Sequence, residues 1–138
     1  MEIPGYLELT NGAFESSDFF PLDNEGFGNT PGQTHNYHFT TEAHVTFAYE
    51  GGKTFSFQGD DDLWIFVNGR LAMDLGGVHE PMQGSIDFDE MATELGIVLA
   101  TPPNTYSMDI FHAERQTLES NFKVQTNITC FEPVIIIK

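Results

Sequence analysis

The sequence predicts an all-β fold, an antiparallel β-sandwich with long connecting loops. Apolar and polar residues alternate in several short segments, which is the pattern of half-buried strands. Glycine and proline separate these segments, and a helical pattern occurs in one short stretch only. Many short strands with almost no helix are typical of sandwiches and barrels. A chain of 138 residues has the size of one domain, so we expect a single domain over residues 1–138.

The first third of the chain is expected to pass from a loop into strands. Residues 11–34 are rich in Gly, Asn, Ser and Asp, which predicts a long loop. Alternation then predicts strand structure within 36–49 and at 54–58, with a turn at Gly51-Gly52 between them.

The centre of the chain carries the clearest hairpin signal. Residues 63–67 form a continuous apolar run, which predicts a central strand covered on both faces. Trp64 could stack on a sugar ring, but its place in such a run favours the core. Asn68-Gly69 is the dipeptide that best tolerates a type I′ turn, so 63–67 should pair with 70–73 as a hairpin.

The remaining elements are shorter. We expect a strand at 85–88, a helix at 89–95 that ends at Gly96, and strands at 106–112 and 121–126.

The charge balance excludes some partners. Five Lys and Arg stand against 21 Asp and Glu, so the net charge is −16. Nucleic acids and anionic membranes are therefore poor partners. The carboxylates are also hard oxygen ligands whose mutual repulsion a divalent cation such as calcium would relieve. The alternative is that the charge only confers solubility.

The sequence also bears on its cellular context. It has no basic segment followed by an apolar one at its start, and its apolar runs, such as 134–137, are too short to cross a membrane. We expect a segment of a larger chain. Cys130 is the only cysteine, so it is expected either to be buried or to pair outside this sequence. Asn127-Ile128-Thr129 fits the N-glycosylation pattern.

The first candidate site is the sequence Gly59-Asp60-Asp61-Asp62, directly before the apolar strand. Three adjacent carboxylates repel one another unless a cation or hydrogen-bond donors neutralise them. Calcium takes six to eight oxygen ligands, and such a run supplies several. The spacing is not that of an EF-hand, and zinc would prefer Cys and His. The alternative is a solvated acidic turn.

Two further segments are candidates. His112-Ala113-Glu114-Arg115 gathers hydrogen-bonding side chains, but it contains neither a nucleophile beside a base nor a zinc motif. The alternative is an Arg115 ion pair and a His112 that satisfies a backbone group. The loop 75–79 contains paired glycines that would let a ligand or another loop approach closely, or would simply form a turn.

Several strings together carry a family resemblance. They are FSFQGDDDLWIFVNGRL at 55–71, DLGGVH at 74–79, DIFHAER at 109–115 with SNF at 120–122, and HNYHFT at 35–40. With these strings the chain resembles the fibro-slime domain, a branch of the protective-antigen-type (PA14-like) β-sandwich family. That family occurs in bacterial surface proteins, slime-mould extracellular proteins and yeast adhesins.

The resemblance implies a calcium site and a ligand rim. In the family's lectins, two consecutive aspartates joined by a cis peptide bind calcium, and the ion holds sugar hydroxyls. The matching pair here is Asp60-Asp61, and Asn121 takes the place of an asparagine that completes the ion's shell. Residues 116–119 depart from the lectin loops, so no particular sugar is implied. The expected rim consists of His79, Glu114 and Arg115.

Two functions remain open from the sequence. One is a calcium-dependent carbohydrate-binding module of an extracellular or cell-surface protein, with glycans as partners and Ca²⁺ as cofactor. The other is a structural domain in which the ion only stiffens the loops, so that the domain serves as a spacer or interaction module. An enzyme is not expected, because adjacent carboxylates beside an ion do not straddle a glycosidic bond as a glycosidase requires.

Overall fold

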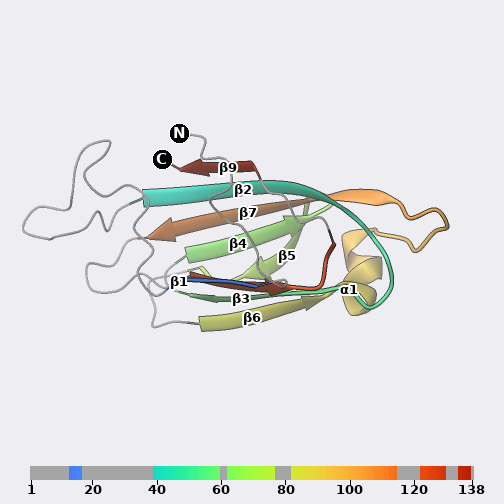
Figure 1. The fold of residues 1–138 in the computed structure, drawn as a ribbon, viewed down its shortest axis with the longest axis horizontal. Coiled ribbons are helices and arrows are strands. Elements are labelled where there is room, and N and C mark those ends of the chain that lie inside the picture. Colours follow the sequence, from blue (N-terminus) through green and yellow to red (C-terminus); the bar gives the residue numbers. More distant parts are fainter. Residues whose placement is uncertain are drawn as a thin grey trace, which may run out of the picture.

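Two antiparallel sheets pack face to face in the computed structural model, which describes residues 13–16, 39–59, 62–76, 82–114, 122–129 and 134–137. The four-stranded sheet contains, in spatial order, β1 (Ala13–Ser16), β8 (Phe122–Thr126), β3 (Thr54–Gly59) and β6 (Met82–Asp87). The five-stranded sheet contains β5 (Arg70–Asp74), β4 (Asp62–Val67), β7 (Thr105–Glu114), β2 (Phe39–Ala48) and β9 (Val134–Ile137). The predicted all-β sandwich is confirmed (Figure 1).

The core lies between the sheets because alternate residues of each strand point inward. From Thr41 in β2 to Tyr49, the residue after its end, every second residue is buried, and the residues between them are half-buried or exposed. The apolar inward side chains of the longer strands fill the interior; they include Val45, Phe47, Ile65, Met108 and Ile110 from one sheet and Phe55, Phe57, Ile86 and Val124 from the other. This period of two is the pattern that predicted the strands.

The Asn68-Gly69 hairpin forms as predicted. Asn68 has φ 53° and Gly69 has φ 72°, as a type I′ turn requires, and the turn joins β4 to β5. The prediction that this apolar strand is covered on both faces is wrong. Leu63, Ile65 and Val67 are buried, whereas Trp64 and Phe66 are half-buried on the outer face of the sheet.

Helix α1 (Phe88–Leu95) closes one end of the sandwich (Figure 1). It begins at Phe88, which the sequence placed in the preceding strand, because the Asp87 side chain accepts hydrogen bonds from the backbone N–H groups of Asp89 and Glu90 at 3.0 and 3.3 Å. Gly96 ends it at φ 67°, the left-handed conformation of a helix C-cap. Within the described residues, no helix has the length and apolar character needed to cross a membrane.

Tyr49 links the end of β2 to helix α1 and to the turn at Gly52. Its buried hydroxyl donates a 2.6 Å hydrogen bond to the Asp89 carboxylate, whose second oxygen accepts the Gly52 N–H at 2.8 Å. Burial, with the hydrogen bond to Asp89, raises the pKa of Tyr49 to about 12, and the hydrogen bond from Tyr49 lowers the pKa of Asp89.

Two short strands were not predicted. Strand β1 lies within the segment that the sequence indicated as a loop, and it pairs with β8. Strand β9 lies in the apolar run near the end of the chain and pairs with β2. Both have four residues, and four residues show too little alternation for a strand to be recognised.

Candidate functional site: one end of the sandwich

The strand ends that flank the predicted segments lie together at the end of the sandwich opposite α1. Gly59, the last residue of β3, pairs with both Met82, the first residue of β6, and Phe122, the first residue of β8. In the other sheet, Asp62 at the start of β4 pairs with Ala113, next to the last residue of β7. Strand β5 also ends there, because its last residue pairs with Trp64. The strand ends on either side of residues 60–61, 77–81 and 115–121 therefore lie at this one end (Figure 1).

These three connections carry the residues that the sequence indicated. Glu114 is described by its backbone as the last residue of β7. The others lie outside the described residues, in the connections: Asp60 and Asp61 in the first, His79 in the second, Arg115 and Asn121 in the third. The cis peptide expected between Asp60 and Asp61, and Cys130, also lie outside the described residues, so these remain predictions. The strand ends that flank the connections lie together, although the predicted residues span more than fifty positions of sequence.

Asp62 is the described member of the acidic run. It is the first residue of β4 and is 4% exposed, which is unusual for a carboxylate, and it is engaged in interactions within the protein. Among the described residues, no three His, Cys, Asp or Glu side chains could hold a metal ion together. An ion here would need the neighbouring aspartates. The run offers only hard oxygen donors, and this chemistry fits calcium.

His112 does not belong to an exposed rim. It is 2% exposed on the inner face of β7, and its ring centroid lies 6.3 Å from that of Phe57 in the opposite sheet. The His112 ring thus packs in the core between the sheets, and the alternative of an Arg115 ion pair lies outside the described residues.

In the loop 75–79, Gly76 lets the Trp64 and Asp74 side chains lie close to its backbone. A Cβ built on Gly76 would come within 3.0 Å of the Trp64 indole and of the Asp74 carboxylate, so only glycine fits there without a shift. The Gly76 N–H donates to Asp74 Oδ1 at 2.9 Å. This part of the loop thus packs on the tryptophan, at the end where the connections leave.

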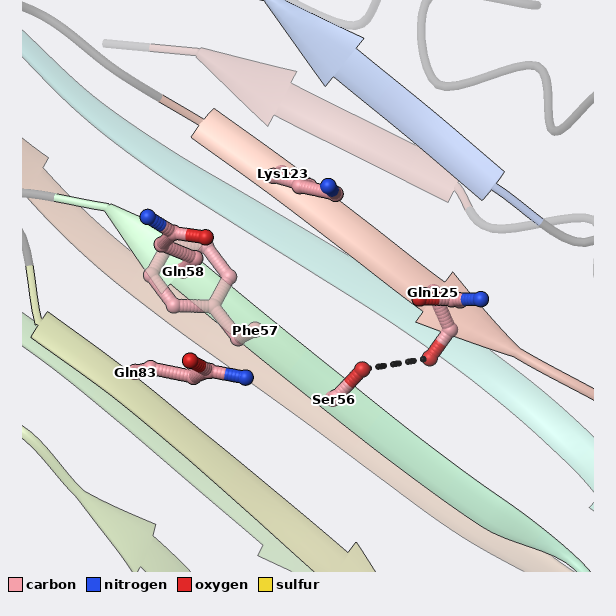
Figure 2. A pocket seen from close by; sticks show the side chains of 6 residues that line it. All are labelled: Ser56, Phe57, Gln58, Gln83, Lys123 and Gln125. Atoms are coloured by element: carbon pink, nitrogen blue, oxygen red, sulfur yellow. Dashed lines mark hydrogen bonds between the residues drawn. The ribbon is translucent and has the colours of Figure 1, made fainter.

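A polar hollow on the four-stranded sheet was missed from the sequence. It lies on the outer face, is shallow and has a volume of about 60 Å³ (Figure 2). Polar side chains of three strands surround it, and Ser56 Oγ donates a 3.3 Å hydrogen bond to the Gln125 carbonyl; the polar lining is Ser56, Gln58, Gln83, Lys123 and Gln125. The available signal was the polar positions that alternate with Phe55 and Phe57, but strand pairing is needed to bring them together.

Comparisons with known proteins are consistent with this architecture. The model of the PA14 domain family matches residues 16–132. In Dictyostelium discoideum, the chain is 42% identical to protein psiB over 123 residues, 36% to protein psiE over 129, and 38% to protein psiC over 128. The alignments cover 83%, 87% and 86% of this chain but 21%, 24% and 23% of those proteins, so the chain spans about a fifth to a quarter of their length. No solved structure matches it.

Proposed function

This chain belongs to the PA14 domain family, and from that premise we propose that it is a calcium-dependent carbohydrate-binding module of an extracellular or cell-surface protein. One observation carries the proposal. The strand ends that flank the acidic pair, the glycine loop and the segment 115–121 all lie at the same end of the sandwich. Residues far apart in the sequence can then act on one ion and one ligand.

The proposed roles follow from ligand chemistry. Asp60 and Asp61 would hold Ca²⁺ together with Asn121, and their charge is balanced by the ion. Bound calcium would offer open coordination positions to a pair of sugar hydroxyls. His79 and Arg115, with Glu114 at the end of β7, would hydrogen-bond the rest of the sugar and set its orientation. We propose no catalytic step, because binding accounts for all of these groups.

The proposed biological setting is a multidomain protein. The curated relatives are four to five times longer than the aligned segment, which supports a module that works beside other domains. A single sugar site of this kind binds weakly, in the millimolar to micromolar range, about −4 to −8 kcal/mol. Linked sites would supply the avidity that adhesion to a glycan surface needs.

The test is thermal unfolding of metal-free protein with and without calcium, followed by titration of the calcium-loaded protein with simple sugars. Calcium at 100 times its Kd should stabilise the fold by about 2.7 kcal/mol. The double variant Asp60→Asn/Asp61→Asn should lose this shift. Glu90→Gln/Glu94→Gln on α1, which removes the same charge at the opposite end, should keep it.

Each outcome decides between the functions. A calcium shift followed by saturable sugar binding that the chelator abolishes supports the proposal. A calcium shift with no response to a broad glycan panel favours the structural calcium-stabilised spacer. An absent calcium shift, or an equal shift in the Asp60→Asn/Asp61→Asn variant, refutes the ion site.

A further inference from the structure

The outer face of the five-stranded sheet presents a row of mixed aromatic and acidic side chains. The strand pairings align five outward residues across the sheet, from β5 to β9: Asp74, Trp64, Phe111, Glu42 and Ile136. Neighbouring strands lie about 4.8 Å apart, so the row is about 19 Å long. Its two rings lie side by side between two carboxylates.

A parallel row lies two residues further along β4, β7, β2 and β9, and three residues further along β5, where the pairing with β4 has a bulge. It consists of Leu71, Phe66, Asp109, His44 and Val134, in the same strand order. Leu71 and Val134, at its two ends, are 50% and 48% exposed. We call the two rows together the outer platform; Figure 1 shows its five strands side by side.

The aromatic rings of the outer platform hold one another in place. Phe66 and Phe111 meet edge to face with centroids 5.8 Å apart and planes at 81°, and His44 meets Phe111 at 5.9 Å and 79°. Both phenylalanines and Trp64 are half-buried, so each ring is supported below and open in part above. The face is therefore a firm apolar surface.

The polar groups of the outer platform are acidic, and they are held in position too. His44 Nδ1 lies 2.7 Å from Asp109 Oδ1, and His44 Nε2 lies 3.4 Å from Glu42 Oε2. Arg70 is the only Lys or Arg in the five strands, and it turns away: its Nη1 donates to the Glu94 carbonyl of α1 at 2.9 Å. Within the described strands, the outward carboxylates of Asp74, Glu42 and Asp109 thus lie beside aromatic rings. His44 is the one side chain of the two rows that can carry a positive charge, so the rows keep an excess of negative charge when it is protonated.

From this complementarity, we propose that the outer platform binds glycans that carry free amino groups, such as chains of glucosamine. The apolar face of a sugar ring packs on an aromatic ring, and an ammonium group is attracted both to the ring and to the carboxylates. A net charge of −16 draws such a chain in from a distance. The inference rests on the proposed function for its ligand class, but the site is separate from the calcium-dependent one.

The test compares two probes with the same sugar backbone, of which one carries free amino groups and the other carries N-acetyl groups: the tetramer of glucosamine and the tetramer of N-acetylglucosamine. Titration calorimetry is done at about pH 6, where the amines are protonated, and with chelator present so that no calcium site contributes. We expect the glucosamine tetramer to bind more tightly than the acetylated one. Asp109→Asn and Phe66→Leu should each weaken it about two- to fivefold, as exposed ion pairs and cation–π contacts do. Glu90→Gln on α1 is the charge-matched control and should change binding little.

Three results would overturn the proposal. Equal binding of the two tetramers would remove the role of the ammonium group. An equal effect of Glu90→Gln and Asp109→Asn would reduce the binding to general charge attraction. A hexalysine peptide that binds as tightly and responds equally to Phe66→Leu would assign the face to basic peptides. Thermal unfolding of each variant establishes that it is folded.

The same experiment separates this site from the proposed function. Binding that survives chelator and the Asp60→Asn/Asp61→Asn change, but is lost in Asp109→Asn, belongs to the outer platform even if no calcium-dependent sugar binding exists. Binding that chelator abolishes belongs to the loop end, and would leave the outer platform without a ligand of this class.

Discussion

The Asn127 side chain hydrogen-bonds the turn that joins β2 to β3, and replacing it with alanine should lower the free energy of unfolding measurably. Its Oδ1 accepts the Thr54 N–H at 2.8 Å, and its Nδ2 donates to the Gly52 carbonyl at 2.8 Å. Lys53 Nζ adds a 3.1 Å bond to the Asn127 carbonyl, which the substitution keeps. The side chain thus hydrogen-bonds two backbone groups that lie 75 and 73 positions earlier in the sequence.

The expected loss follows from these two bonds. Each intramolecular hydrogen bond contributes about 0.5–1.5 kcal/mol net, and solvent near this turn favours the lower half, so Asn127→Ala should cost about 1–2 kcal/mol. For a chain of 138 residues the unfolding entropy is about 0.3 kcal/mol per kelvin, which converts the loss to a Tm decrease of about 3–7 °C.

Calorimetry measures the Tm, and amide hydrogen exchange locates the effect. The Thr54 amide should exchange faster in Asn127→Ala, whereas the Tyr49 amide, which donates to the Asn104 carbonyl, should not change beyond the global loss. Thr129→Ala is the matched control. It removes the glycosylation pattern but keeps both hydrogen bonds of the Asn127 side chain, and it should shift the free energy of unfolding by no more than about 0.5 kcal/mol. A Tm unchanged in Asn127→Ala would refute the reasoning, as would an equal loss in Thr129→Ala.

Three further substitutions test other contacts. The hydrogen bond to Asp109 raises the pKa of His44 above its usual 6.5. Protonated His44 therefore stabilises the fold fully below about pH 6.5, and this stabilisation is lost as the pH rises through the folded-state pKa. Urea unfolding should show that His44→Gln costs more at about pH 5.5 than at about pH 8.5; equal costs would contradict this. The Tyr49 pKa of about 12 means that the unfolded chain ionises first, so unfolding free energy should decrease above about pH 10, and less steeply in Tyr49→Phe. Parallel pH dependences would show that other groups cause it. Gly96→Ala, at φ 67°, should cost about 1–2 kcal/mol by urea unfolding, and Gly51→Ala, where a Cβ has room, should cost nothing; similar values would rule out backbone strain.

The sequence was most informative where a local rule decides the structure. Alternation identified β2, β3 and β7, and the Asn68-Gly69 pair identified the hairpin, because each depends on neighbouring residues. Strand β9 could not be predicted in this way, since its place depends on pairing with β2, more than ninety positions earlier.

The apolar run at 63–67 shows how the same rule fails. Continuous hydrophobicity suggested burial on both faces, but the outer face of β4 carries aromatic residues that pack on a neighbour in the same sheet. Alternation reports burial alone, so it cannot distinguish a core position from a half-open aromatic surface.

Some features of the candidate site could be predicted from the sequence, and others could not. Residue chemistry indicated a metal at Asp60-Asp61, and the family resemblance, which the PA14 match confirms, supplied the partner loops. Spacing alone could not have brought the three connections to one end, because that depends on strand order in two sheets.

Gly59 pairs with two strands at once, so a single backbone position joins the starts of both. One backbone position anchors the first residues of two strands, Met82 of β6 and Phe122 of β8, and it is followed at once by the acidic pair. A substitution that displaces the Gly59 backbone would therefore disturb the first residue pairs of both β6 and β8 at once, so the two strand starts depend on one position in the sequence.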